Sequence, residues 1–161
     1  MGMLKKVSWP SNFESKVLTL KPDVPTSQHT AAARMDVMFM KRDQLSTADT
    51  MRLVEMYRDA AKQHGEATET GDHKTANKSA DLISEVYAEL RRRGADAQRT
   101  LLPLLTDPAS GVRLWSASHA FEFAPEQGES VLKKFASSET FLGSSAEMTL
   151  NEWRAGRLRF P

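Results

Sequence analysis

The sequence predicts an all-α protein in which a largely irregular N-terminal arm precedes a domain of about six short helices. Apolar residues recur at spacings of three and four from about residue 46 to the end of the chain. Asp-Pro and Ala-Pro steps, together with glycines, mark the starts and stops of these segments. No segment after residue 46 shows the strict alternation of a half-buried strand.

Composition narrows the class of protein further. The 161 residues are a one-domain length, and 40% hydrophobic and 27% charged residues are ordinary for a globular domain. The chain has no cysteine, which excludes disulfides, thiol nucleophiles and thiolate zinc sites. No apolar run reaches the roughly 20 residues of a membrane span, and the N-terminus lacks the apolar stretch of a signal peptide. We therefore expect a cytoplasmic protein without a membrane partner.

The chain divides into two unlike parts, an arm over residues 1–45 and a helical domain over residues 46–161. The arm carries seven basic and four acidic side chains, a net charge of +3, whereas the helical domain carries fifteen and seventeen, a net charge of −2. A nucleic-acid-binding domain usually shows a clear basic excess. The helical domain does not, and this disfavours nucleic acid as the partner.

Residues 1–45 show no sustained helical period. Val17–Leu20 predicts a short strand, which a segment with two prolines ends, and Met35–Met40 is an apolar patch. These apolar segments suit an arm that reaches another subunit, so a homo-oligomer is possible through it. The alternative is a flexible tail, or a natural start at Met40.

The first helix of the domain is predicted from a capping box at Ser46–Asp49. The apolar positions that follow predict one buried face: Met51, Val54, Tyr57 and Ala61. Residues 65–72 are polar and contain glycine, so they predict a loop that ends in Asp72 as the next N-cap.

The second helix is predicted to run from Asp72 to Arg93, where Gly94 serves as its C-cap. Its expected inner face consists of Ile83, Val86, Tyr87 and Leu90. Its outer face carries an acidic stripe that repeats every four residues: Asp81, Glu85 and Glu89. The three arginines of its last turn complement the helix dipole: Arg91, Arg92 and Arg93.

Prolines shape the next two helices. Leu101–Leu105 predicts a short buried helix that tolerates Pro103 because the proline lies near its start. Asp107 and Pro108 predict an N-cap followed by proline at the first helical position. The expected inner side chains of the helix after this turn are Val112, Trp115, Ala120 and Phe123.

The last two helices are predicted from similar signals. Ala124-Pro125-Glu126 ends one helix and begins the fifth, whose inner face carries Val131, Leu132 and Phe135. A second capping box, Ser144–Glu147, predicts the start of the final helix, which ends at Gly156. Its inward side chains are expected to be Ala146, Leu150 and Trp153.

The stretch from Leu101 to Ala117 resembles a HEAT-type repeat, in which a proline lies in the first helix, an aspartate in the turn, and Val-Arg opens the second. The matching residues are Leu101, Leu102, Pro103, Leu105, Asp107, Val112, Arg113 and Ala117. The resemblance implies a HEAT-like stack of short antiparallel helices. It also implies that Pro103, Asp107, Val112 and Arg113 are structural residues, with Arg113 a scaffold rather than a catalyst.

Most of the chain also resembles a bacterial domain-of-unknown-function family, number two thousand and nineteen. The matching features are MKRDQLS at Met40–Ser46, Gln63, AELRRRG at Ala88–Gly94 and, most specifically, Arg99–Pro125. The resemblance covers about Met40 to Pro161. It implies a HEAT-like fold and no agreed activity.

Residues that could carry chemistry are few. The four histidines, His29, His64, His73 and His119, form no HExxH pattern. His119 and Glu122 are three residues apart, a spacing found in metal-binding bundles, but the further carboxylates of such a site are missing. The polar group at His64, Glu66, Glu69, Asp72 and His73 suits a solvated loop. We therefore expect no metal, no cofactor and no catalytic residue.

Protein binding is the leading hypothesis: a non-catalytic helical module. Its more specific form is an immunity or antitoxin-like protein that binds a basic toxin through Asp81, Glu85 and Glu89. A glycosylase-like nucleic-acid binder is the alternative, with phosphate contacts from Arg91, Arg92, Arg93 and Arg99. A structural protein that self-associates through the arm is a third hypothesis. An enzyme acting on a small molecule has no residue-level support.

Overall fold

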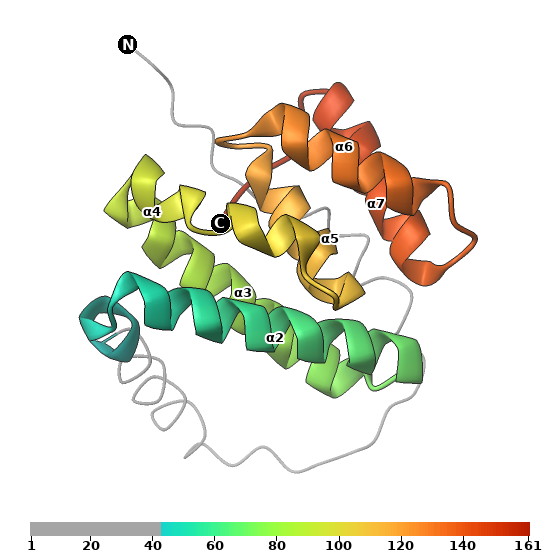
Figure 1. Cartoon of the computed structure of the whole chain (residues 1–161). Helices are drawn as coiled ribbons and strands as arrows, with labels where there is room; N and C mark the ends of the chain where they lie inside the picture. Colours follow the sequence, from blue (N-terminus) through green and yellow to red (C-terminus); the bar gives the residue numbers. More distant parts are fainter. Residues whose placement is uncertain (1–42) are drawn as a thin grey trace.

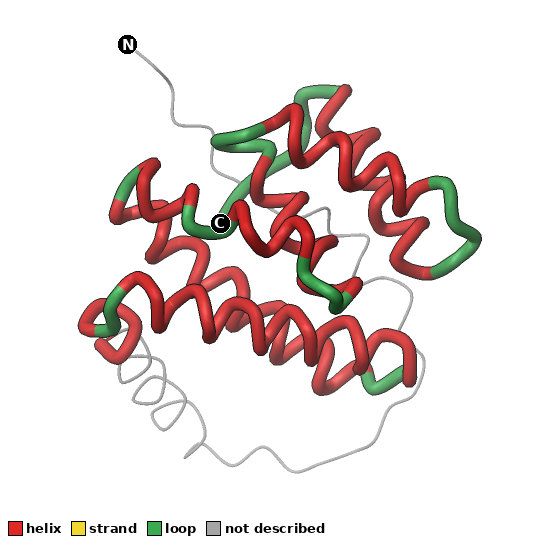
Figure 2. Tube along the Cα trace, in the orientation of Figure 1, coloured by secondary structure: helices red, strands yellow, loops and turns green. Residues whose placement is uncertain are grey.

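The computed structural model describes residues 43–161, and all regular structure in this part of the chain is helical (Figures 1 and 2). The predicted all-α class is confirmed. The strand expected at Val17–Leu20 and the apolar patch at Met35–Met40 lie outside the described residues. A helical turn at 43–47 leads into these elements: α2 (Thr50–Thr70), α3 (His73–Arg93), α4 (Ala95–Arg99), the 3₁₀ helix η2 (Leu102–Thr106), α5 (Ser110–Ala120), α6 (Pro125–Ala136) and α7 (Phe141–Arg154).

The start of α2 corrects the first predicted capping box. Asp49 is the N-cap, and its carboxylate accepts a hydrogen bond from the backbone N–H of Arg52 at 2.7 Å. The Ser46 hydroxyl instead donates to the carbonyl of Asp43 in the preceding turn. Two cap-forming residues stand close together in this sequence, and the carboxylate is the one that caps the helix.

The loop predicted over residues 65–72 is wrong, because α2 continues to Thr70 and ends at Gly71, whose φ is 76°. Gly65 is buried inside the helix against α5, so it serves a helix crossing rather than a turn. The buried face of α2 is made by Leu53, Tyr57, Ala60, Ala61, His64, Gly65 and Ala67. Met51, predicted to face inward, is 66% exposed.

The second predicted helix is confirmed as α3. Asp72 caps it by accepting a hydrogen bond from the Thr75 N–H, and Gly94 ends it with a positive φ of 102°. All four predicted inner side chains are fully buried: Ile83, Val86, Tyr87 and Leu90. α2 and α3 form an antiparallel hairpin (Figure 1).

The segment around Pro103 differs from its prediction in two details. It is a 3₁₀ helix, and Leu102 is half-buried while Leu101, Leu104 and Leu105 are buried. Asp107 does not cap the next helix, since α5 begins at Ser110 with Ala109 as its N-cap residue. The carboxylate of Asp107 accepts from the Ala109 N–H at 2.9 Å, which stabilises a local turn instead.

The start of α7 corrects the second predicted capping box. The helix begins at Phe141, and the Thr140 hydroxyl accepts from the Gly143 N–H at 3.1 Å. Ser144 therefore lies within the first turn. The start of α6 at Pro125 agrees with the prediction. At the far end of α7, Trp153 stacks on Phe121 with ring centroids 4.6 Å apart.

α5 lies between the α2–α3 hairpin and the α6–α7 hairpin (Figure 1). From Gly111 to Ala120 every residue of α5 except Arg113 is buried. Val112 and Trp115 join the core shared with α2 and α3, whereas Leu114, Ala117 and Ala120 join the core shared with α6 and α7. The domain therefore has two hydrophobic clusters with α5 common to both.

Two glycines let α5 approach its neighbours closely. A Cβ built on Gly111 would stand 2.5 Å from the carbonyl oxygen of Ala61 and 2.9 Å from the Cα of Gly65. A Cβ built on Gly128 in α6 would stand 2.5 Å from the carbonyl oxygen of Ala117. Backbone meets backbone at both crossings, so neither can take a side chain without moving a helix.

We expect Gly111→Ala to lower the free energy of unfolding by about 1–3 kcal/mol, because the added methyl group forces α5 away from α2. Urea unfolding followed by circular dichroism measures the change. Lys78→Ala is the control, since Lys78 is an exposed residue of α3. Equal stabilities for Gly111→Ala and Lys78→Ala would contradict the close-approach interpretation.

Candidate functional site

A stack of aromatic rings surrounds His119 in the core. Its imidazole lies parallel to the Tyr87 ring at a centroid distance of 3.8 Å, and its Nδ1 shares a 2.7 Å hydrogen bond with the Tyr57 hydroxyl. Nε2 is buried without a hydrogen-bond partner in the part of the chain that the structure describes. Burial lowers the pKa of His119 to about 3, so the ring is neutral near pH 7.

Glu122 forms hydrogen bonds with three side chains beside this stack. Its carboxylate accepts hydrogen bonds from the Tyr87 hydroxyl and the Arg91 Nε, both at 2.5 Å, and from the Gln98 Nε2 at 3.1 Å. Arg91 also donates to the carbonyl of Pro161 at 3.2 Å. His119 and Glu122, whose three-residue spacing raised the metal hypothesis, thus each bond other side chains of the domain. Residues 43–161 contain no group of three or more His, Asp or Glu side chains suited to a metal ion.

The four arginines considered for phosphate binding each contact a carboxylate of the protein itself. Arg91 pairs with Glu122, Arg92 and Arg93 both pair with Glu89, and Arg99 pairs with Asp96. Arg93 also donates to the backbone carbonyls of residues 45, 46 and 48, which holds the helical turn at 43–47 against α3. Phosphate binding at these positions would have to displace existing ion pairs.

The acidic stripe on α3 is less available than its spacing suggested. Glu89 bonds both Arg92 and Arg93, and its hydrogen bond with Arg92 is the main cause of its lowered pKa. Glu85 is half-buried, and one of its carboxylate oxygens lies out of solvent. Asp81 remains as the exposed carboxylate of the stripe.

Asp107 and Arg113, the aspartate and arginine of the HEAT-type resemblance, bond other groups rather than forming a side-chain ion pair with each other. Asp107 bonds Arg58 of α2, whose Nε lies 2.6 Å from its Oδ2. Arg113 donates instead to the carbonyls of Asp107 and Pro108, and its guanidinium lies 5.3 Å from the centroid of the Phe135 ring. Both arginines therefore contact the turn before α5.

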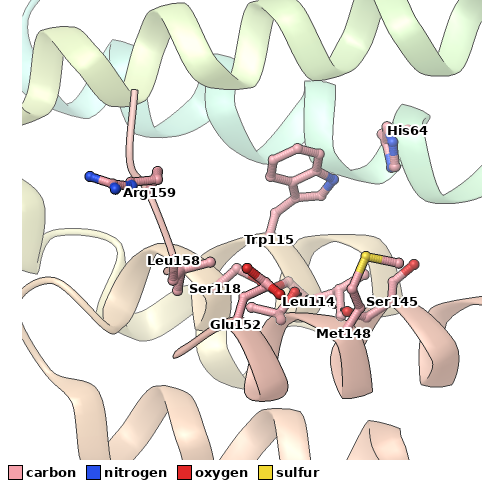
Figure 3. A pocket seen from close by; sticks show the side chains of 10 residues that line it. His64, Leu114, Trp115, Ser118, Ser145, Met148, Glu152, Leu158 and Arg159 are labelled. Atoms are coloured by element: carbon pink, nitrogen blue, oxygen red, sulfur yellow. Dashed lines mark hydrogen bonds between the residues drawn. The ribbon is translucent and has the colours of Figure 1, made fainter. Parts of the chain in front are cut away.

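A small groove opens where α5, α7 and the C-terminal segment meet (Figure 3). It measures about 40 Å³, and the residues that line it are His64, Leu114, Trp115, Ser118, Ser145, Met148, Thr149, Glu152, Leu158 and Arg159. Most of the wall is apolar. Space of this size holds a few water molecules or one side-chain tip.

His64 and Trp115 meet at one end of the groove. Their rings are perpendicular at a centroid distance of 5.1 Å, and Figure 3 shows the indole nitrogen turned toward the imidazole. Burial lowers the pKa of His64 to about 4, so this ring is also neutral near pH 7. The His64 Nδ1 is buried without a partner among the described residues.

One face of α7 borders the groove and is open to solvent. Phe141, Ser145, Met148 and Glu152 follow one another at spacings of four, three and four, and we call this face the α7 stripe. Phe141 is 58% and Met148 41% exposed. The sequence interpretation missed this face because it began the helix at Ser144. The seven-residue spacing of Phe141 and Met148, with Thr140 as the cap, was the signal that could have found it.

The last residues fold back along the groove. Gly156 reverses the chain with φ 67°, and the Arg157 guanidinium bonds both carboxylate oxygens of Glu152 at 3.1 and 2.7 Å. Leu158 then lines the groove and packs on the second hydrophobic cluster. Sequence reasoning ended its description at Gly156 and did not find this segment.

Comparison with known proteins places this arrangement in a family. The family model described as domain of unknown function (DUF2019) matches residues 51–153, which include α3, α5, α6 and nearly all of α2 and α7. The chain belongs to the DUF2019 family. No match was found among curated proteins. None of the helices within residues 43–161 is long and apolar enough to cross a membrane.

A solved structure shares the fold of this DUF2019 protein. The protein RPA1889 from Rhodopseudomonas palustris CGA009 superposes with a TM-score of 0.67 at 24% sequence identity. The match covers 73% of the present chain and 98% of RPA1889. The likeness concerns the fold alone. The finer resemblance to a HEAT-type repeat stays a prediction for the DUF2019 chain.

The buried histidines of the DUF2019 domain predict a pH-dependent stability. The folded-state pKa values of His119 and His64, about 3 and about 4, lie below the unfolded value of 6.5. The unfolded chain therefore takes up protons first as the pH falls. Stability is full above pH 6.5 and falls toward pH 5, by up to about 1.4 kcal/mol per pH unit for each histidine.

Urea titrations between pH 7 and pH 5 measure this slope. His119→Phe keeps an aromatic ring against Tyr87, and it should remove the contribution of one histidine to the pH dependence of the free energy of unfolding. His64→Phe should remove a similar contribution. His73→Phe, at an exposed position, is the control and should leave the slope unchanged. A slope that survives in both buried variants would contradict the assignment.

Proposed function

We propose that this DUF2019 chain is a non-catalytic protein-binding module whose contact surface is the α7 stripe with the adjoining groove. The observation that carries the proposal is the exposure of two large apolar side chains, Phe141 and Met148, on a helix whose opposite face already fills the core with Leu142, Ala146 and Leu150. Apolar side chains gathered on a helix surface beside a groove are typical of protein contact sites.

The groove suits an anchor side chain from a partner better than a substrate. Its volume of about 40 Å³ is far below the several hundred Å³ usual for small-molecule sites. Trp115 and Met148 supply a large ring and an adaptable thioether, which are favoured at binding hot spots. The neutral, buried state of His64 supports the non-catalytic part of the proposal.

An immunity-like role in the cytoplasm is a specific form of this proposal. It requires a basic partner. Glu139 and Glu147 are exposed carboxylates near the α7 stripe, and Asp81 is a separate exposed carboxylate on α3. The ion pairs of Arg91, Arg92, Arg93 and Arg99 give no comparable support to nucleic-acid binding.

Affinity purification of the tagged full chain from its host tests the proposal. Wild type should retain a stoichiometric protein that Phe141→Asp/Met148→Glu loses, because charges replace the apolar contacts. With the purified partner, the double variant should weaken binding at least about 30-fold, the effect of losing a hot spot of 2 kcal/mol.

Met51→Glu is the matched control, since Met51 is a methionine of α2 that is more exposed than Met148 and does not belong to the α7 stripe. Circular dichroism of all variants establishes that they fold. Retention of the same partner by Phe141→Asp/Met148→Glu would refute the assignment of the surface, and loss by Met51→Glu alone would move the contact to α2.

A further inference from the structure

The charges around the α7 stripe are not balanced within the described part of the chain. Glu129 and Glu152 are held by basic neighbours, Glu129 by Lys133 and Glu152 by Arg157. Glu139 before α7 and Glu147 within it are exposed and form no ion pair with any described residue. Glu139 and Glu147 line one hollow with Phe141, whereas Arg159 lies in the groove beside Glu152. The Phe141 end of the stripe is therefore an apolar surface with two carboxylates beside it, which favours a basic and apolar partner segment.

The chain's own sequence contains such a segment. Residues 34–42 read RMDVMFMKR, in which Met35 and Val37–Met40 are apolar and Arg34, Lys41 and Arg42 are basic. With Asp36 the net charge of the segment is +2.

The basic end of the segment, Lys41 and Arg42, is too close to Asp43 along the chain to reach the stripe of its own chain. It joins the described chain at Asp43, next to the turn that Arg93 holds at the C-terminal end of α3. The stripe borders His64, which lies fourteen residues along α2 from Thr50, or about 21 Å at 1.5 Å per residue. Figure 1 shows the start of α2 and the start of α7 at opposite sides of the molecule. Met40, three residues before Asp43, reaches only about 10 Å.

We propose that residues 34–42 of one copy bind the α7 stripe of a second copy, and reciprocally, so that two chains form a two-fold dimer. The proposal rests on the α7 stripe being a protein contact surface, and it names the partner as this chain itself. The apolar side chains of Val37–Met40 cover Phe141 and Met148. Lys41 and Arg42 pair with Glu139 and Glu147, which fixes the direction of the bound segment.

Light scattering of the full chain at about 100 µM tests the dimer. Wild type should have twice the chain mass of 18.0 kDa. Glu139→Lys/Glu147→Lys should give the monomer mass, as should Lys41→Glu/Arg42→Glu, because each places like charges together. Combining all four substitutions should restore the dimer. Asp81→Lys, a charge reversal on α3, is the control and should remain dimeric.

A synthetic peptide of residues 30–45 gives a second measurement that needs no folded variant. Added in tenfold excess, it should convert wild type to monomers, while the same peptide with Lys41→Glu and Arg42→Glu should not. A monomeric wild type, a dimer that ignores the peptide, or a fourfold variant that stays monomeric would overturn the proposal.

The dimer and the more general protein-binding function predict different outcomes. A monomeric wild type that still captures a protein lost by Phe141→Asp/Met148→Glu overturns the dimer and leaves the binding module intact. A dimer that dissociates in the charge variants, with no other protein captured, supports the present inference and removes the separate partner.

Discussion

The close approach of α5 to both neighbouring hairpins is the constraint on which the fold depends. Gly111 lets α5 touch the backbone of α2 at Gly65, and Gly128 lets α6 touch the backbone of α5. Because α5 is buried on both sides, its buried polar side chains bond protein atoms: His119 shares a hydrogen bond with Tyr57 of α2, and two serines use the helix itself. Ser116 and Ser118 each donate to the carbonyl four residues earlier, which satisfies their hydroxyls without an outside acceptor.

Arginine side chains connect the chain segments around this central helix. Arg93 holds the entry to α2, Arg58 holds the turn before α5, and Arg91 connects α3 to the last residue of the chain. Each guanidinium offers several fixed donors, so one side chain can bond several acceptors on separate elements. A run of arginines in a neutral helical domain can therefore reflect helix ends and chain crossings rather than an anionic ligand.

Helix periodicity predicted the class and most inward faces, because apolar spacing depends on the helix alone. α3 was predicted correctly at both ends, since Asp72 and Gly94 have no nearby competitors. Gly65 was misread because its purpose is a contact with Gly111, a residue forty-six positions away. The α7 stripe was missed for a related reason. Which face of a helix stays open depends on the neighbours that cover the rest, and those neighbours follow from tertiary structure.

The two-sided burial of α5 has a consequence for synthesis on the ribosome. When α5 emerges it can dock at once on the completed α2–α3 hairpin through Val112 and Trp115. Its other side, with Leu114, Ala117 and Ala120, stays uncovered until α6 and α7 are translated. Nascent chains of this protein thus display an apolar surface for a defined interval, during which a chaperone can bind it.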